Sequence, residues 1–212
     1  MNRRELLVAI GLYGLGFFVR PAPATALGGD PPPLDQPAPS FQLGGVAPAA
    51  GRDPKASTLI ATVERNLEDF RGHWLVLYFY PKDFTSGCTL EARGFQRDLR
   101  SFHAADAEVV GISADDTEAH ASFCGSEGLA FPLLSDPGGE VSRRYGSWLA
   151  PYSQRHTFLI DPEGVLRARW VAVRPLNHSQ EVLEELMRQR ESLSRSDRHD
   201  LPRASRTTAA TA

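Results

Sequence analysis

The chain has 212 residues, of which 42% are hydrophobic and 23% are charged. These values predict one folded domain with appended segments and exclude a chain that is disordered throughout. The formal net charge of -3 gives no electrostatic reason to expect nucleic-acid binding. Two cysteines without a C-x-x-C pair exclude a disulfide scaffold and argue against a thioredoxin-type dithiol motif or a zinc ribbon.

Residues 1–26 are predicted to be an export signal. Two arginines at positions 3 and 4 precede an uncharged, largely apolar run at 6–19, which is short for a membrane-spanning helix. Ala-Thr-Ala at 24–26 then resembles a signal-peptidase site, so we expect cleavage after Ala26. The expected location is a periplasm or a thylakoid lumen, without stable membrane association after cleavage. An uncleaved membrane anchor is the alternative.

Both ends of the remaining chain have the composition of segments outside a core. Residues 27–36 are predicted to form a Pro-rich, extended linker. Residues 192–212 are rich in Ser, Arg, Thr and Ala and are predicted to form a disordered tail. The folded domain is therefore expected at 37–191.

Strand-like and helix-like segments alternate within this domain. The apolar run at 74–80 predicts a buried strand, and apolar residues at helical spacing predict a helix at 88–102. The segments expected after it are a strand at 108–112, a helix at 117–127, a short apolar segment at 131–134, a short helix at 140–145, strands at 156–160 and 165–171, and a helix from 179 to about 191. Asp-Pro-Glu-Gly at 161–164 is turn sequence, so the last two strands are expected to form a hairpin. This order predicts an α/β fold with a central mixed sheet flanked by helices.

Cys88 lies where the strand at 74–80 gives way to the next helix. A cysteine in a first helical turn faces unpaired backbone N–H groups and the positive end of the helix dipole, and both stabilise a thiolate. Thr85 carries a hydroxyl that can donate and accept hydrogen bonds at once, so it would orient a substrate of the thiolate and support the sulfur. Pro81 fixes the turn out of the strand and would shield the thiolate from water. A buried structural cysteine is the alternative interpretation.

The motif Pro81-x-x-x-Thr85-x-x-Cys88 matches the active-site motif of peroxiredoxins. The flanking residues 78–83 (Tyr-Phe-Tyr-Pro-Lys-Asp) resemble the bacterioferritin-comigratory, or Q-type, branch of that family. The resemblance extends from about residue 37 to the last helix. It implies a thioredoxin-like fold with peroxiredoxin insertions, and a peroxidase in which Cys88 is the peroxidatic thiol.

Two charged residues acquire roles from the same resemblance. Residues 155–161 resemble a later strand of the family whose arginine reaches the active site. Arg155 is thereby expected to hold the thiolate and polarise the peroxide, a task that suits a fixed guanidinium. Glu91 matches a common family position and would tie this arginine in place.

Cys124 is expected to be the resolving thiol. Many members of this branch carry the resolving cysteine five residues after the peroxidatic one, but Arg93 stands there in this chain. Other peroxiredoxins place it on the helix where Cys124 lies. Because a disulfide requires Cα atoms within about 7 Å, one or both helix ends would have to unwind locally. The alternative is that Cys124 is an apolar filler in a one-cysteine peroxidase.

The expected function is the reduction of hydrogen peroxide and organic hydroperoxides, with a thioredoxin or similar dithiol as reductant. No cofactor is expected. His120 and Cys124 are spaced like metal ligands, but the sequence offers no third ligand, so no metal is expected either. The chain is expected to be a monomer. A non-enzymatic redox-sensing or holdase module is the alternative function.

Overall fold

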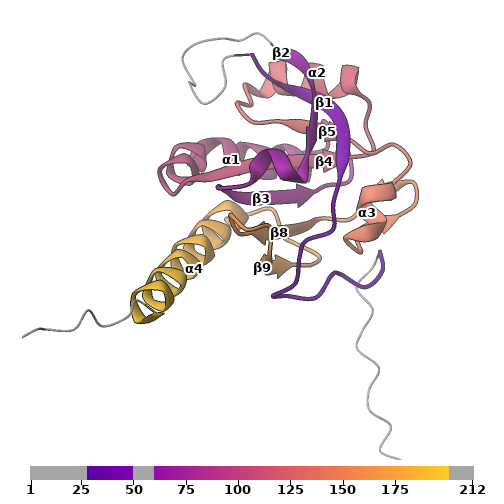
Figure 1. Ribbon diagram of the computed structural model, residues 1–212. Helices are drawn as coiled ribbons and strands as arrows, with labels where there is room; N and C mark the ends of the chain where they lie inside the picture. The colour runs from indigo at the N-terminus through magenta and orange to yellow at the C-terminus, as the bar shows by residue number, and fades with distance from the viewer. Residues whose placement is uncertain (1–27, 50–59, 201–212) are drawn as a thin grey trace, which may run out of the picture.

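The computed structural model describes residues 28–49 and 60–200. The described chain is built on a seven-stranded sheet with the order β2-β1-β5-β4-β3-β8-β9 (Figure 1). Its strands are β1 (Gln42–Pro48), β2 (Ile60–Asn66), β3 (Trp74–Phe79), β4 (Ala107–Ser113), β5 (Leu133–Ser135), β8 (His156–Ile160) and β9 (Leu166–Trp170). The short strands β6 (Trp148–Leu149) and β7 (Tyr152–Ser153) pair separately. The helices are the 3-10 helix η1 (Leu67–Phe70), α1 (Ser86–Ala104), α2 (Thr117–Glu127), α3 (Glu140–Arg144) and α4 (His178–Asp200).

β3 is the strand from which the chain enters α1. All six of its side chains are buried, as its unbroken apolar sequence predicts. It pairs in parallel with β4 and antiparallel with β8. The predicted hairpin of β8 and β9 is also present, and Gly164 in its turn has a φ of 77°, which favours glycine.

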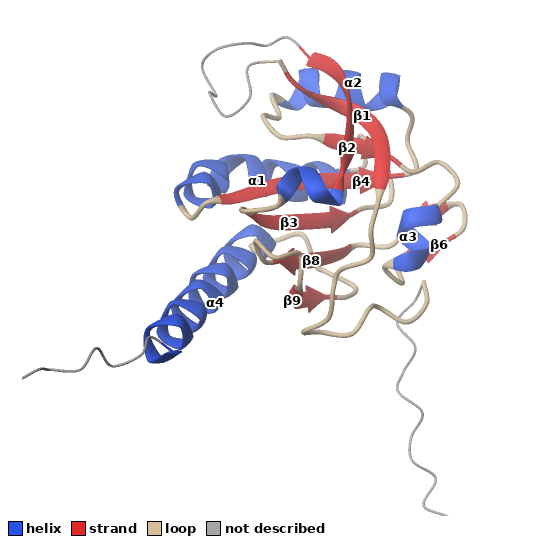
Figure 2. Cartoon of the chain, in the orientation of Figure 1, coloured by secondary structure: helices blue, strands red, loops and turns tan. Residues whose placement is uncertain are grey.

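Helices cover both faces of the sheet, as expected from the order of elements (Figure 2). Val76 and Tyr78 of β3 belong to a core that includes buried residues of α1, α2 and α4. Leu75 and Leu77 alternate with them and pack with η1 and α3 on the opposite face. The result is a thioredoxin-like α/β layer structure with a mixed sheet, which confirms the predicted fold class.

The sequence did not predict β1 and β2, which form the far end of the sheet. Two adjacent glycines interrupt β1, and glycine is depleted in strands. Gly45 is nevertheless required, because a Cβ there would lie 2.1 Å from the carbonyl oxygen of Leu133 on β5. Close pairing with a neighbouring strand therefore explains a glycine that resembles loop sequence.

The boundaries of the domain differ from those predicted at both ends. α4 continues through Asp200, so the start of the predicted tail at Ser192 is wrong for the residues that the structure describes. Glu191 ion-pairs with Arg195 at i,i+4, which stabilises this extra helix. The rest of the predicted tail, residues 201–212, lies outside the described residues.

The predicted linker at 27–36 is docked where it is described. We call residues 28–38 the N-terminal strap. The backbone N–H of Asp35 donates to the Leu166 carbonyl at 2.8 Å, and that of Leu166 donates to Gln36 at 2.9 Å. Farther along, Ala38 donates to Gly164 at 2.9 Å. The strap thus pairs with the outer side of β9 (Figure 1), a contact that Pro-rich composition does not indicate.

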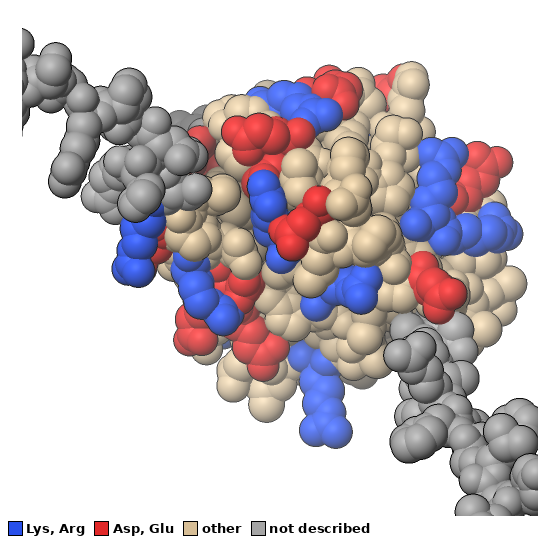
Figure 3. Space-filling view, turned by 60° about the horizontal axis from the view of Figure 1, so that its bottom comes forward, with Lys and Arg blue, Asp and Glu red and all other residues tan. Residues whose placement is uncertain are grey.

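No helix among residues 28–49 and 60–200 is long and apolar enough to cross a membrane. The predicted export signal at 1–26 lies outside those residues. On the face seen in Figure 3, acidic and basic side chains are interspersed.

Candidate active site

Cys88 lies in the first turn of α1, where the sequence predicts it. The helix begins at Ser86 with Thr85 as its N-cap, and its first turn is closed by the bond from the Thr89 N–H to the Thr85 carbonyl at 2.9 Å. The thiol is free and only 1% exposed. Cys88 therefore belongs to the turn whose backbone N–H groups have no intrahelical partner.

Arg155 contacts this sulfur. Its Nη2 donates a hydrogen bond to the Cys88 Sγ at 3.3 Å. The antiparallel register pairs Phe79, the last residue of β3, with His156, the first residue of β8. Arg155 therefore lies just beyond the end of β3, where the chain enters α1. The structure brings together the two residues that the sequence nominated for the thiolate and its cation.

Gly87 makes room for the guanidinium. A Cβ at this position would lie 3.2 Å from the Arg155 Nη2, which is closer than ordinary van der Waals contact. A side chain there would press on the same nitrogen that reaches the sulfur. The glycine before Cys88 is thus explained by the position of Arg155.

Glu91 holds the other side of Arg155. Its carboxylate accepts a short hydrogen bond from the Arg155 Nη1 and is 1% exposed, as the expected tie to the arginine requires. Burial raises the pKa of Glu91 to about 7, although Arg155 opposes this shift. Burial lowers the pKa of Arg155, but the charges of Glu91 and Cys88 outweigh it and leave that pKa raised. Arg155 is therefore held as a cation between sulfur and carboxylate.

Thr85 and Pro81 lie in the loop between β3 and α1. The Thr85 hydroxyl is exposed and donates to the Lys82 carbonyl at 3.0 Å, so its oxygen remains an acceptor toward solvent. Pro81 is half-buried in the turn after β3. The hydrogen bond of Thr85 is directed to the loop and not to the sulfur, so the expected roles of both residues toward a peroxide remain predictions.

Cys124 lies on α2 and is also a free, buried thiol. Burial raises its pKa to about 12, and the charge of Asp83 adds to this shift. Cys88 and Cys124 belong to the same hydrophobic core, and no disulfide joins them. In this state the second thiol is protonated and shielded.

A buried polar network lies between the two cysteine-bearing helices and was not predicted from the sequence. His120 of α2 shares a hydrogen bond with Asp83 of the active-site loop, with 2.8 Å between Nδ1 and Oδ2. The Tyr80 hydroxyl donates to the other Asp83 oxygen at 2.7 Å. The sequence noted His120 only for its metal-like spacing with Cys124. Its actual partner comes from a different element.

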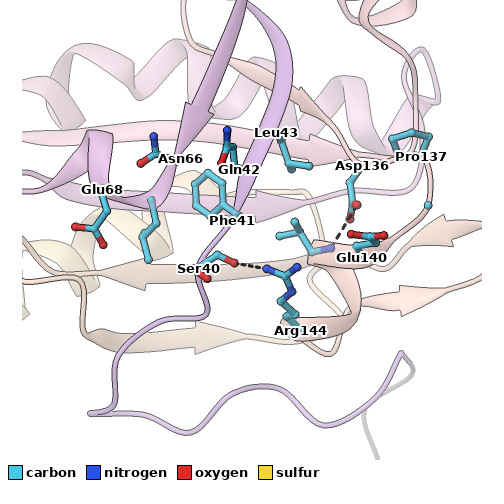
Figure 4. Close-up of a pocket in the computed structure, with 13 residues that line it drawn as sticks. Ser40, Phe41, Gln42, Leu43, Asn66, Glu68, Asp136, Pro137, Glu140 and Arg144 are labelled. Carbon is cyan, nitrogen blue, oxygen red and sulfur yellow. Dashed lines mark hydrogen bonds between the residues drawn. The ribbon is translucent and has the colours of Figure 1, made fainter.

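A large surface pocket lies elsewhere on the described part of the chain. It has a volume of about 690 Å³ and is lined by residues at the start of β1, by η1 and by the start of α3 (Figure 4). Asp136 accepts from the Ser142 N–H at 2.8 Å, and Arg144 donates to the Ser40 carbonyl at 2.8 Å. None of the residues around Cys88 lines this pocket. The candidate centre is instead the buried sulfur of Cys88 in the first turn of α1.

A strand-to-helix junction carrying a thiol beside a fixed arginine defines a thiol-redox protein of the thioredoxin-like class. The family model of the AhpC/TSA family matches residues 34–169, and the chain belongs to this family. Several of its relatives are named Bcp or Peroxiredoxin Q, which supports the Q-type branch of peroxiredoxins. The resemblance noted in the active-site motif is thereby confirmed.

Two curated relatives illustrate the similarity. Peroxiredoxin Bcp of Xanthomonas campestris is 38% identical over 148 residues, which are 66% of this chain and 91% of that protein. The mitochondrial thioredoxin-dependent peroxide reductase of Drosophila melanogaster is 39% identical over 125 residues, which are 55% of this chain and 53% of that protein.

Two solved structures of Xanthomonas campestris Peroxiredoxin Q are also similar, each a variant with a different cysteine changed to serine. One has a TM-score of 0.58 and 36% identity, and the match covers 60% of this chain and 85% of that one. The other has a TM-score of 0.59 and 32% identity, and the match covers 68% of this chain and 90% of that one. The two replaced cysteines are separated by the same number of residues as Cys88 and Cys124.

Proposed function

We propose that this protein is a thiol peroxidase that reduces hydrogen peroxide and organic hydroperoxides at Cys88. The observation that carries the proposal is the 3.3 Å contact between the Arg155 Nη2 and the Cys88 Sγ at the N-terminus of α1. A guanidinium and a helix N-terminus place positive charge beside this sulfur, and the thiolate is the form of a cysteine that acts as a nucleophile. The same cation stabilises negative charge as it develops on a peroxide oxygen.

In the first step the Cys88 thiolate attacks one oxygen of the peroxide. The O–O bond breaks, the sulfur is oxidised to a sulfenic acid, and the other oxygen leaves with the bonding electron pair. That oxygen takes up a proton and departs as water or an alcohol. Arg155 stabilises the negative charge on the Cys88 sulfur and on the departing peroxide oxygen. Glu91 keeps the guanidinium of Arg155 in place.

In the second step the Cys124 thiol condenses with the sulfenic acid. A disulfide forms and water leaves. The matching separation of the two replaced cysteines in Peroxiredoxin Q supports this assignment. Because Cys124 is buried on a separate helix, we expect the first turn of α1, the segment around Cys124, or both to open locally before the two sulfurs meet.

An external dithiol then reduces the disulfide by exchange. The name of the Drosophila melanogaster relative, a thioredoxin-dependent peroxide reductase, supports a thioredoxin-like reductant. From the predicted signal at 1–26 we expect an exported protein, in a periplasm or a thylakoid lumen, and we expect a monomer. N-terminal sequencing of the native protein tests cleavage after Ala26, and an intact signal would indicate the uncleaved anchor.

The decisive test is a steady-state peroxidase assay with a thioredoxin couple on wild type, Cys88→Ser and Cys124→Ser. We expect Cys88→Ser to abolish peroxide consumption. Cys124→Ser should still oxidise once but lose turnover with this reductant. Turnover without Cys88 would refute the proposal, and full turnover without Cys124 would indicate a one-cysteine peroxidase. A wild type that oxidises without consuming peroxide catalytically would favour the redox-sensing module.

A further inference from the structure

The buried contact between Asp83 and His120 joins two segments that must separate during the proposed cycle. Asp83 lies in the loop that leads from β3 to Cys88, and His120 lies on α2. Their side chains are 1% and 0% exposed, and their polar atoms are 2.8 Å apart. A hydrogen-bonded contact at this depth is not screened by solvent, so it resists separation of the two segments.

His120 and Cys124 are four residues apart on α2, so they lie on the same face of the helix. Both side chains are buried, and Cys124 belongs to the core cluster that also contains Tyr80 and Cys88. Cys124 also lies near enough to Asp83 for that carboxylate to contribute to its protonation. An opening of α2 that reaches back from Cys124 by one turn therefore breaks the contact of His120 with Asp83.

A second contact follows the same path. The ring of Phe84, next to Asp83 in the loop, packs edge-on against Phe123 of α2 with 5.1 Å between centroids. Phe84 is 55% exposed and has a φ of 59°, which is strained for a non-glycine residue. The apolar contact is thus at the surface, whereas the Asp83–His120 pair is the buried attachment.

The pair is only partly satisfied. Asp83 accepts from both Tyr80 and His120, but the buried Nε2 of His120 has no hydrogen-bond partner within the described part of the chain. A buried polar atom without a partner destabilises the closed arrangement. Opening α2 gives this nitrogen access to water. The hydrogen bond at Nδ1 therefore stabilises the closed position of α2, while the unpaired Nε2 lowers the free-energy cost of opening it.

We propose that the Asp83–His120 pair is a latch that holds Cys124 away from Cys88 and sets the rate of disulfide formation. His120 acts in this scheme as a positioning residue. The proposal rests on the proposed function, because it requires Cys124 to be the resolving thiol.

The latch decides between two fates of the Cys88 sulfenic acid. Condensation with Cys124 forms the disulfide and releases water. Alternatively, the sulfenic acid sulfur attacks a second peroxide, takes one oxygen to become a sulfinic acid, and the other peroxide oxygen leaves as water or alcohol. By delaying condensation, a closed latch lengthens the time in which the second reaction occurs.

The test compares wild type with His120→Ala, His120→Asn and Tyr145→Phe. Rapid-mixing fluorescence separates the oxidation phase from the disulfide phase, and mass spectrometry measures the sulfinic acid formed as hydrogen peroxide is raised. Asparagine keeps an N–H close to the position of Nδ1. Tyr145→Phe is the matched control, because it removes a buried hydroxyl that donates to the Pro39 carbonyl on the other face of the sheet.

We expect His120→Ala to accelerate the disulfide phase about tenfold, the factor that corresponds to one hydrogen bond to a charged group. Its yield of sulfinic acid should fall, while the oxidation phase stays within about twofold of wild type. His120→Asn should restore much of the wild-type rate, and Tyr145→Phe should change neither phase. If His120→Ala does not fold, Asp83→Asn, which keeps the acceptor and removes the charge, should give an intermediate acceleration.

A disulfide phase and a sulfinic acid yield that are unchanged in the folded variants would overturn the latch. Equal acceleration in Tyr145→Phe would also overturn it, because general loss of stability would then explain the effect. Failure of the proposed function looks different: a wild type that never joins Cys88 to Cys124 excludes Cys124 as the resolving thiol before any variant is compared.

Discussion

Arg155 occupies the space between the sulfur of Cys88 and the carboxylate of Glu91, with one Nη atom directed to each. A planar guanidinium reaches both partners at once, whereas an ammonium group is a single point charge. The side chain at position 155 therefore has a geometric as well as an electrostatic task.

Arg155→Lys is expected to lower the second-order rate constant for peroxide by about 10²- to 10³-fold, the range seen when one preorganised donor to a developing charge is lost. Rapid mixing with hydrogen peroxide measures it. Arg167→Lys is the matched control, because Arg167 is ion-paired with Asp161 away from the sulfur. A rate in Arg155→Lys equal to that of the control would contradict the assigned role.

Glu91 should make the stability of the protein depend on pH. Burial raises its pKa from 4.5 to about 7, so the folded protein holds this proton more tightly than the unfolded chain. Release of the proton therefore favours unfolding, and the contribution of Glu91 to the free energy of unfolding decreases as pH rises from 4.5 to about 7. The full stabilising contribution of Glu91 is present below pH 4.5, which is the pKa of this residue in the unfolded chain.

Glu91→Gln removes that titration. The free energy of unfolding of wild type, relative to the variant, should fall between about pH 5 and about pH 8 in urea denaturation. A difference between the two proteins that stays constant across this window would show that Glu91 does not titrate there.

At the scale of elements, α2 is stabilised at both ends by local contacts. The Asp116 side chain accepts from the Ala119 N–H at 2.8 Å at the N-cap, and Gly128 ends the helix in the left-handed conformation. These contacts and the latch stabilise the same helix, but the hydrogen bond of the N-cap stays within α2.

Asp116→Ala should lower the free energy of unfolding by about 1 kcal/mol, because one N–H at the start of α2 loses its acceptor. Asp116→Asn keeps an acceptor at the N-cap and should remain close to wild type. Urea denaturation measures both. Equal destabilisation by the two substitutions would mean that the charge of Asp116, and not its cap, is what stabilises the helix.

Helices and strands that are specified by a pattern in their own residues could be predicted from the sequence. The apolar run of β3 and the helical spacing in α1 placed both within a few residues. β1 was missed because Gly45 is required by the close approach of the β5 backbone, and β5 is a neighbour that no local sequence pattern reveals. The same distinction holds at the site. Cys88 follows from its motif, whereas the Asp83–His120 contact joins residues 37 apart and has no signal in either segment.

At the scale of the whole molecule, the N-terminal strap protects the outer edge of the sheet. It pairs with β9 through the bonds of Asp35, Leu166 and Ala38, and Arg167 adds an ion pair to Asp35 at 3.0 Å. An uncovered edge strand offers its free N–H and carbonyl groups to other chains. The strap therefore extends the fold beyond the residue at which the sequence placed its start.

A chain that begins at Ala38 should unfold at a temperature roughly 5–10 °C below one that begins at Leu27, because several backbone hydrogen bonds are lost. It should also scatter more light as protein concentration rises. Thermal unfolding followed by circular dichroism, with parallel light scattering, checks both outcomes. Identical melting and scattering of the two chains would mean that the strap does not contribute to the fold.

The pairing of β8 with β3 has a consequence for the newly made chain. Arg155 follows Cys88 by 67 residues, and it reaches the sulfur only when β8 has joined the sheet. For a ribosome that adds roughly 5–20 residues per second, Cys88 exists for roughly 3–13 seconds before its arginine has been synthesised. During that interval the nascent thiol lacks its contact with the guanidinium. The Arg155–Cys88 contact therefore forms late in biosynthesis, after the residues of β8 have been added.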